Sequence, residues 1–213
     1  MNKKVVLRSD DEDDDSIEVI GEDSLAYFER SIQLHCVEVP LDETIKLPRY
    51  YRKILQRMKS LTKHDQLNIT VNTYGGSLDG AIALINGMQN TEATVTATLD
   101  GMAASAGSLI FLSAENVAVM PYSQMMIHQG SFGAFGSQTN VQKKSAFIDE
   151  QMRKLMREVY TNFLTPEELE DVFKGLEIWL DYEEIVRRLE LRAEILQSQQ
   201  GGDEDDQQPS MVT

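Results

Sequence analysis

Short apolar segments alternate with segments of helical periodicity over the first two thirds of the chain. Five segments predict strands: HCVEV (35–39), QLNITVN (66–72), ATVTATL (93–99), NVAVM (116–120) and QMMIH (124–128). Helical spacing predicts helices over 49–61 and 77–88, and a third, apolar helix that ends at Leu112. This strand–helix–strand order predicts an α/β fold with parallel strands, whose functional loops lie at the carboxyl ends of the strands.

A long amphipathic helix is predicted to begin at Gln138. Its apolar stripe consists of Ile148, Met152, Leu155, Met156, Val159 and Phe163. The stripe can pack on the sheet of its own chain. If the helix projects outward instead, the stripe needs another subunit.

Two capping boxes divide the segment that follows this helix. Thr165 and Glu168, with a proline between them, predict a helix that Gly175 ends. After a short strand, LEIWL (176–180), Asp181 and Glu184 predict the start of a last helix.

Composition favours one folded domain with an acidic arm at each end. The 213 residues carry a net charge of -15, of which residues 1–23 hold -6 and residues 197–213 hold -4. We therefore expect a mobile acidic arm over 1–23, a folded domain over 24–196 and a disordered tail over 197–213. No basic stripe is visible in the sequence, which argues against nucleic acid as a ligand.

The cellular location is predicted from what the sequence lacks. It has neither a secretory leader nor a run near the roughly 20 apolar residues of a membrane span. A single cysteine, Cys36, excludes an intramolecular disulfide and a cysteine-cluster metal site. We expect a cytoplasmic protein with no membrane partner.

Ser105 lies in GMAASAGS (101–108), where a predicted strand turns into a helix. The small neighbours either allow close helix packing or leave room for a substrate beside the hydroxyl. A nucleophilic serine needs a base, and of the three histidines only His128 follows it, at the end of an apolar strand. His35 and His64 lie in the first strand and in a polar loop. The pair Ser105 and His128 is therefore the candidate for nucleophilic catalysis.

A paired-glycine turn, Gly75-Gly76, follows the second predicted strand and opens a helix. Its free N–H groups could bind an oxyanion, or the turn could be only a tight connection. No GxGxxG or GxxxxGK[ST] pattern supports nucleotide binding. An α/β-hydrolase is disfavoured for two reasons. Ala103 stands at the first glycine of GxSxG, and Glu115 is the only acidic residue between the serine and the histidine, where such enzymes have the acid of their triad.

Three segments resemble the proteolytic subunit of the Clp protease. NTYGGSLDGAIAL is similar to its N-S-P-G-G turn and following helix, GMAASAG to its G-Q-A-A-S-M-G serine segment, and MPYSQMMIHQ to its P-x-S-x-x-M-I-H-Q histidine segment. The order and spacing agree, and the similarity is clear from about Cys36 to Ile148 and weaker from there to about Ile185. The resemblance implies an α/β fold of the ClpP/crotonase-like type, with repeated β-α units and a protruding long helix, the handle. It also implies a serine peptidase without metal or cofactor.

The resemblance implies a role for each matching residue. Ser105 would be the nucleophile and His128 the general base, with the N–H groups of Gly75 and Ala106 as the oxyanion hole. Substrate binding would fall to Gly76 and to the glycine-rich segment after the histidine, namely Gly130, Ser131, Phe132 and Gly133.

Departures from the family pattern indicate a divergent member. Tyr74 and Gly130 stand where the family has prolines, and the closing G-L-V-D segment is missing. The family's triad aspartate matches Glu177, with Asp181 and Asp171 as rivals. Asp181 has a competing explanation as a helix N-cap.

The resemblance also implies partners. Family members form heptameric rings that can stack as a tetradecamer around a chamber, which an ATP-driven AAA+ unfoldase feeds with polypeptide. A phage-type member would serve capsid maturation instead. Two other functions stay open: an idle scaffold of the same fold that binds partner subunits, and an acyl-CoA enzyme of the crotonase fold. In the latter, the same N–H groups would polarise a thioester carbonyl.

Overall fold

The structure, a computed structural model, describes residues 34–130 and 137–205. Contacts divide the chain into two units, Met1–His35 and Cys36–Thr213, and the fold described below is that of the second. The arm predicted over 1–23 lies outside the described residues. At the other end, the last helix continues to Asp205, so residues 197–205 are helical where the sequence predicts a disordered tail.

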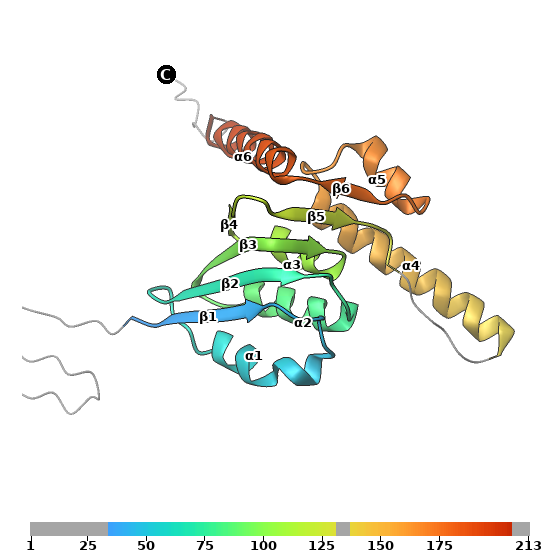
Figure 1. The fold of residues 1–213 in the computed structure, drawn as a ribbon, viewed down its shortest axis with the longest axis horizontal. Coiled ribbons are helices and arrows are strands. Elements are labelled where there is room, and N and C mark those ends of the chain that lie inside the picture. The colour runs from blue at the N-terminus through green and yellow to red at the C-terminus, as the bar shows by residue number, and fades with distance from the viewer. Residues whose placement is uncertain (1–33, 131–136, 206–213) are drawn as a thin grey trace, which may run out of the picture. The chain divides into compact units, whose positions relative to one another are not determined.

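The described residues form a six-stranded sheet in the order β1-β2-β3-β5-β6, with β4 also beside β3 (Figure 1). The strands are β1 Cys36–Leu41, β2 Gln66–Thr73, β3 Thr94–Ala104, β4 Asn116–Val119, β5 Gln124–Ile127 and β6 Ile178–Leu180. All pairs are parallel except β5 with β6, which is antiparallel. The predicted parallel α/β fold is confirmed.

Strand β3 ends at Ala104, whereas the sequence predicts an end at Leu99. The strand continues beyond Leu99 through a bend at Gly101. Gly101 has a φ of 113°, and a Cβ at this position would lie 2.6 Å from Asn72 Oδ1. Asn72 Oδ1 accepts a hydrogen bond from Met102 N at 3.1 Å, so the neighbouring strand holds the bent segment. Beyond this bend β3 pairs with β5 instead of β4, which brings the ends of β3 and β5 together.

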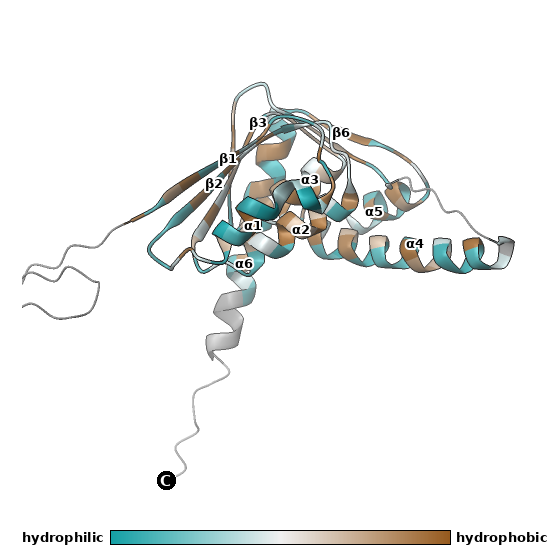
Figure 2. Cartoon of the chain, turned by 90° about the horizontal axis from the view of Figure 1, so that it is seen from below, coloured by the Kyte–Doolittle hydropathy of each residue, from teal (hydrophilic) through white to brown (hydrophobic). Residues whose placement is uncertain are grey.

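The helices are η1 Pro48–Tyr51, α1 Arg52–Met58, α2 Leu78–Gln89, α3 Ala106–Leu112, α4 Gln138–Tyr160, α5 Pro166–Phe173 and α6 Tyr182–Asp205. Figure 2 shows α1, α2 and α3 on one face of the sheet. The face they cover is apolar, with Leu67, Ile69, Val71, Val95, Ala97 and Leu99 buried. Alternate residues such as Asn68 and Thr96 are only partly buried on the opposite face. Within the described residues, no helix is both long enough and apolar enough to span a bilayer.

The two halves of α4 have different surroundings. Met152, Met156, Val159 and Tyr160 in its C-terminal half are buried in the main hydrophobic core. The N-terminal half extends away from the sheet, and Phe147 there is 62% exposed (Figure 1). The apolar stripe thus packs within its own chain from Met152 onward, whereas the N-terminal half leaves Phe147 exposed.

An ion-pair network around Arg188 joins α5 to α6. Its guanidinium donates to both carboxylate oxygens of Glu168 at 2.7 Å and to Glu184 Oε1 at 2.6 Å, and its side chain is only 11% exposed. The Arg188 hydrogen bonds lower the pKa of Glu168. Arg187, with Arg188, lowers the pKa of Glu184 to about 2. Both ionised carboxylates therefore stabilise the folded protein at a pH above about 4.3, the pKa of an unperturbed glutamate. This stabilisation is lost as the pH falls from there through their lowered pKa values.

Replacing Arg188 by methionine is expected to lower the free energy of unfolding by about 2 kcal/mol at neutral pH, because two partly exposed carboxylates lose a largely buried partner. The difference from wild type should shrink as the pH falls from about 4.3 through the folded-state pKa of Glu184 near 2, because the carboxyls become protonated over this range. Urea unfolding at several pH values measures both effects. Arg187→Met is the matched control, since that side chain is 61% exposed and solvent screens its pair with Glu184, so the loss should be much smaller than for Arg188→Met, as is typical of exposed ion pairs. An equal loss in both variants would contradict a special role of Arg188.

Candidate active site

Ser105 lies at a sharp turn between β3 and α3. Its φ of 55° and ψ of -119° are unusual for a residue with a side chain. Its backbone N–H donates to the carbonyl of Met126 on β5 at 2.8 Å, which fixes the turn against the neighbouring strand. A strained serine between a strand and a helix is the arrangement that exposes a nucleophilic hydroxyl in many hydrolases.

Ser105 and His128 are in direct contact. The distance from Ser105 Oγ to His128 Nε2 is 2.8 Å, and both side chains are partly buried. The contact follows from the sheet, because Ala104 at the end of β3 pairs with Met126 near the end of β5 and each candidate residue comes just after. The hydroxyl donates to Nε2 when that nitrogen is unprotonated, so the geometry suits removal of the serine proton.

The segment after His128 contacts α4. Gln129 Nε2 donates to Asp149 Oδ1 at 2.8 Å, and Asp149 is also paired with Arg153 at 2.8 Å. Gly130 lies so close to α4 that a Cβ there would be 2.9 Å from Met152 Cε. These contacts hold the histidine segment between β5 and α4. Asp149 cannot be recognised from the sequence, because a charged residue on an amphipathic helix carries no distinguishing signal.

Gly75 and Ala106 lie beside Ser105, as the oxyanion prediction requires. A Cβ on Gly75, whose φ is 94°, would be 2.9 Å from Ser105 Cβ and 3.1 Å from Ala106 N. Ala106 opens α3, and no acceptor among the described residues receives a hydrogen bond from its N–H. The Gly75 N–H donates to Thr73 Oγ1 at 3.1 Å. An incoming oxygen would therefore compete with the Thr73 hydroxyl, a residue that sequence analysis missed.

Gly76, predicted to bind substrate, packs against the segment after β1. A Cβ there would lie 2.5 Å from Ile45 O, and the two residues form an isolated bridge. This close contact explains why a glycine stands at position 76 without any role in substrate binding. Ser131, Phe132 and Gly133, also predicted to bind substrate, lie outside the described residues.

The three candidate acids have different partners. Glu177 is exposed and accepts a hydrogen bond from Trp179 Nε1 at 3.1 Å. Asp181 accepts from Glu184 N at 3.0 Å, which is the predicted N-cap contact of α6. Asp171 is paired with Lys174 at 2.8 Å. Among the described residues, none of these acids is hydrogen-bonded to His128.

The strand register distinguishes Glu177 from its rivals. Met125, Met126 and Ile127 of β5 pair with Leu180, Trp179 and Ile178 of β6. The printed pairs end at Ile127 and Ile178, and Glu177 and His128 are the next residue on each side, both outside the strands. Side chains directly opposite each other lie on the same face of a sheet with their Cβ atoms about 5 Å apart. If the register continued by one residue, Glu177 would lie on the face that carries His128.

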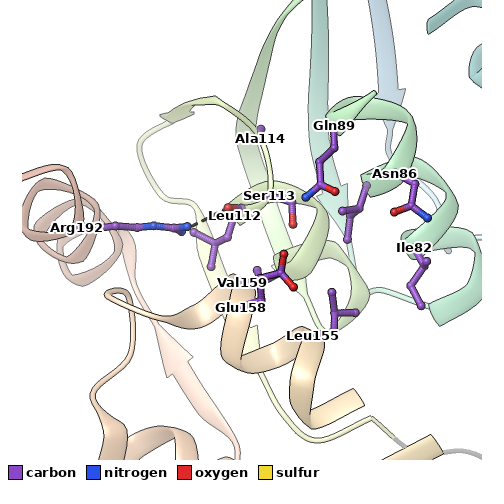
Figure 3. Close-up of a pocket in the computed structure, with 11 residues that line it drawn as sticks. Ile82, Asn86, Gln89, Leu112, Ser113, Ala114, Leu155, Glu158, Val159 and Arg192 are labelled. Atoms are coloured by element: carbon purple, nitrogen blue, oxygen red, sulfur yellow. Dashed lines mark hydrogen bonds between the residues drawn. The ribbon is translucent and has the colours of Figure 1, made fainter. Parts of the chain in front are cut away.

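A cavity of about 340 Å³ lies at the other end of α3, away from Ser105 (Figure 3). It is bounded by α2, α3, α4 and α6, and Figure 3 shows Arg192 at its edge, donating to Leu112 O at 3.4 Å. Burial lowers the pKa of Arg192. The candidate chemistry does not depend on this cavity. In the described part of the chain, no cluster of three or more His, Cys, Asp or Glu residues could hold a metal ion.

Comparison with known proteins identifies the family and the fold. The family model for Clp protease matches residues 36–187. Among solved structures, a point mutant of ClpP1 from Listeria monocytogenes is similar, with a TM-score of 0.59 and 23% sequence identity over 71% of this chain and 86% of that chain. This likeness supports the ClpP/crotonase-like fold, and the family match covers both candidate catalytic segments. The chain belongs to the Clp protease family and is a ClpP-like peptidase.

Proposed function

We propose that the protein is a serine endopeptidase in which Ser105 is the nucleophile and His128 the general base. The observation that carries the proposal is the 2.8 Å contact between Ser105 Oγ and His128 Nε2 at a strained turn. This contact favours a peptidase over an acyl-CoA enzyme, which would not need the pair. The strained backbone of Ser105 favours a peptidase over an idle scaffold, because a non-catalytic chain has no reason to maintain backbone strain at a serine.

The proposed reaction uses the groups gathered at this turn. Ser105 Oγ attacks the carbonyl carbon of the scissile peptide bond while His128 Nε2 takes the hydroxyl proton. The oxyanion of the tetrahedral intermediate accepts hydrogen bonds from the N–H groups of Gly75 and Ala106. His128 then gives its proton to the leaving amine, and water hydrolyses the acyl-enzyme by the same steps.

We propose Glu177 as the acid that orients His128. The register of β5 and β6 supports this role, because continuing it by one residue beyond Ile127 and Ile178 would bring Glu177 opposite His128. In the described geometry the Glu177 carboxylate is bonded to Trp179, so a rotation of the glutamate side chain is needed for it to reach His128 Nδ1. The extra methylene group of glutamate relative to aspartate gives it that reach.

The test of the peptidase proposal is cleavage of a short fluorogenic peptide by the purified protein. Turnover is expected without nucleotide, and a fluorophosphonate should stop it by reacting with the catalytic serine. Absence of turnover in a fully assembled sample would contradict the proposal. Turnover that survives the fluorophosphonate would point to another mechanism.

We further propose that the chain assembles into rings through exposed apolar residues. Family members form heptameric rings, and the exposed N-terminal half of α4 offers a surface for contact between subunits. An AAA+ unfoldase, or a capsid precursor in a phage setting, would then supply the polypeptide substrate. The exposure of Phe147 supports the assembly, since a large aromatic side chain on a projecting helix gains stability when another subunit covers it.

Replacing Phe147 by glutamate is expected to reduce the mass of the particle while leaving the melting of the subunit nearly unchanged. Met152→Glu is the contrasting variant. Met152 is 8% exposed, so an unpaired charge there should destabilise the subunit itself by about 3 kcal/mol or more. Sedimentation velocity and thermal far-UV dichroism separate the two outcomes. If Phe147→Glu leaves the particle mass unchanged, this half of α4 does not hold subunits together.

A further inference from the structure

A buried chain of hydrogen bonds connects the end of α4 to the turn that carries Ser105. Tyr160 is the last residue of α4, and its hydroxyl lies 2.8 Å from Ser108 Oγ. Ser108 Oγ in turn donates to the carbonyl oxygen of Ser105 at 2.7 Å. The side chains of Tyr160 and Ser108 are 1% and 0% exposed, so water does not replace these contacts.

The direction of the hydrogen bonds is fixed by their chemistry. A serine hydroxyl has one proton, and Ser108 gives it to the Ser105 carbonyl, which can only accept. Tyr160 must therefore be the donor to Ser108 Oγ. Burial raises the pKa of Tyr160, so its hydroxyl keeps the proton that this bond requires.

The acceptor at the end of this chain belongs to the peptide group whose N–H is the Ala106 oxyanion donor. Ser105 C=O and Ala106 N–H are the two ends of one planar trans peptide and point in opposite directions. Ser105 O also accepts from Ser108 N at 3.0 Å and Leu109 N at 3.4 Å, and the hydroxyl bond is the shortest of the three. Hydrogen bonds that fix the direction of the Ser105 carbonyl therefore also fix the direction of the Ala106 N–H.

We propose that Tyr160 and Ser108 are positioning residues that aim the Ala106 N–H at the oxyanion. The two backbone N–H groups that donate to the Ser105 carbonyl, those of Ser108 and Leu109, belong to α3 and move with it. The hydroxyls of Ser108 and Tyr160 connect the same carbonyl to α4. Donation to the carbonyl also polarises the peptide group and strengthens its N–H as a donor. This role rests on the proposed peptidase function, and it extends the site to a residue that follows the nucleophile by 55 positions.

The test compares Tyr160→Phe with Tyr51→Phe, using a short fluorogenic peptide and a peptide boronate that mimics the tetrahedral intermediate. Tyr51 is also buried, and its hydroxyl accepts a hydrogen bond from Lys46 N at 3.0 Å, but it lies on η1, outside the site. Tyr160→Phe is expected to lower kcat about 10-fold with KM unchanged, and to weaken boronate binding by the same factor, because only the transition state uses the oxyanion donor. Tyr51→Phe should leave all three values unchanged.

Ser108→Ala provides a second variant that removes the other link of the chain. It should reproduce the loss in kcat, and the double variant should lose no more than Ser108→Ala alone, because both changes interrupt one path. Unchanged kcat in both single variants, or a rise in KM alone, would overturn the positioning role. If wild type cleaves peptides and these variants match it, only this inference fails. If wild type itself shows no turnover, the proposed function fails and this inference falls with it.

Discussion

Replacing Ser105 by alanine is expected to abolish peptide hydrolysis while leaving the folded protein almost unchanged. The substitution removes the attacking oxygen and its contact with His128 at 2.8 Å, but no large cavity is opened. Because Ser105 already has a φ of 55°, alanine inherits the same backbone strain, and the free energy of unfolding should change by less than about 1 kcal/mol. Peptide turnover and urea unfolding of the same preparation measure the two parts of this prediction.

Ser113→Ala is a suitable control for this experiment. Ser113 lies at the opposite end of α3, where its hydroxyl donates to Leu109 O at 2.7 Å. It should keep normal turnover. Full activity in a carefully purified Ser105→Ala protein would mean that another residue supplies the nucleophile.

Glu177→Gln is the second change with a large expected effect. Glutamine keeps the shape of the side chain and can still accept the hydrogen bond from Trp179, but it loses the negative charge. If Glu177 stabilises the imidazolium of His128, kcat should fall by about 10⁴-fold, the size of effect that follows loss of the charge from a triad acid. Steady-state kinetics on a short peptide give this value directly.

Asp181→Asn is the matched control, because asparagine caps a helix as well as aspartate does. Asp181 accepts from Glu184 N at 3.0 Å, and this bond should survive, so most of the activity should remain. The reverse result would identify Asp181 as the acid. If neither variant loses activity, His128 acts without an acid, or with another one such as Asp171.

The strands and helices were largely predictable because their signals are local. Alternating residues in β2 and the capping box of Thr165 and Glu168 act within a few positions, and the structure has both where the sequence predicts them. The extension of β3 to Ala104 was not predictable, because it depends on Asn72 of the neighbouring strand receiving the bent segment after Gly101. The helical continuation of α6 to Asp205 was also missed, since an acidic, glycine-containing stretch carries no helical signal of its own.

Some residues of the candidate site were predictable from the sequence and others were not. Ser105 and His128 were identified from their segments, and the pairing of β3 with β5 explains why they meet. Thr73, Ser108 and Tyr160 were not identified, because their contacts join residues that the sequence does not relate. The same holds for the bond from Gln129 to Asp149. A motif marks the atoms that react, whereas the groups that hold them are known only once the chain is folded.

The most direct test of the proposed chemistry is to treat the assembled protein with a fluorophosphonate probe and to locate the adduct by mass spectrometry. Only a serine whose proton is removed by a nearby base reacts readily with such a probe. We expect one adduct, on Ser105, and its loss in the His128→Ala variant. No adduct, or an adduct on another serine, would contradict the central claim that Ser105 and His128 form the nucleophilic pair.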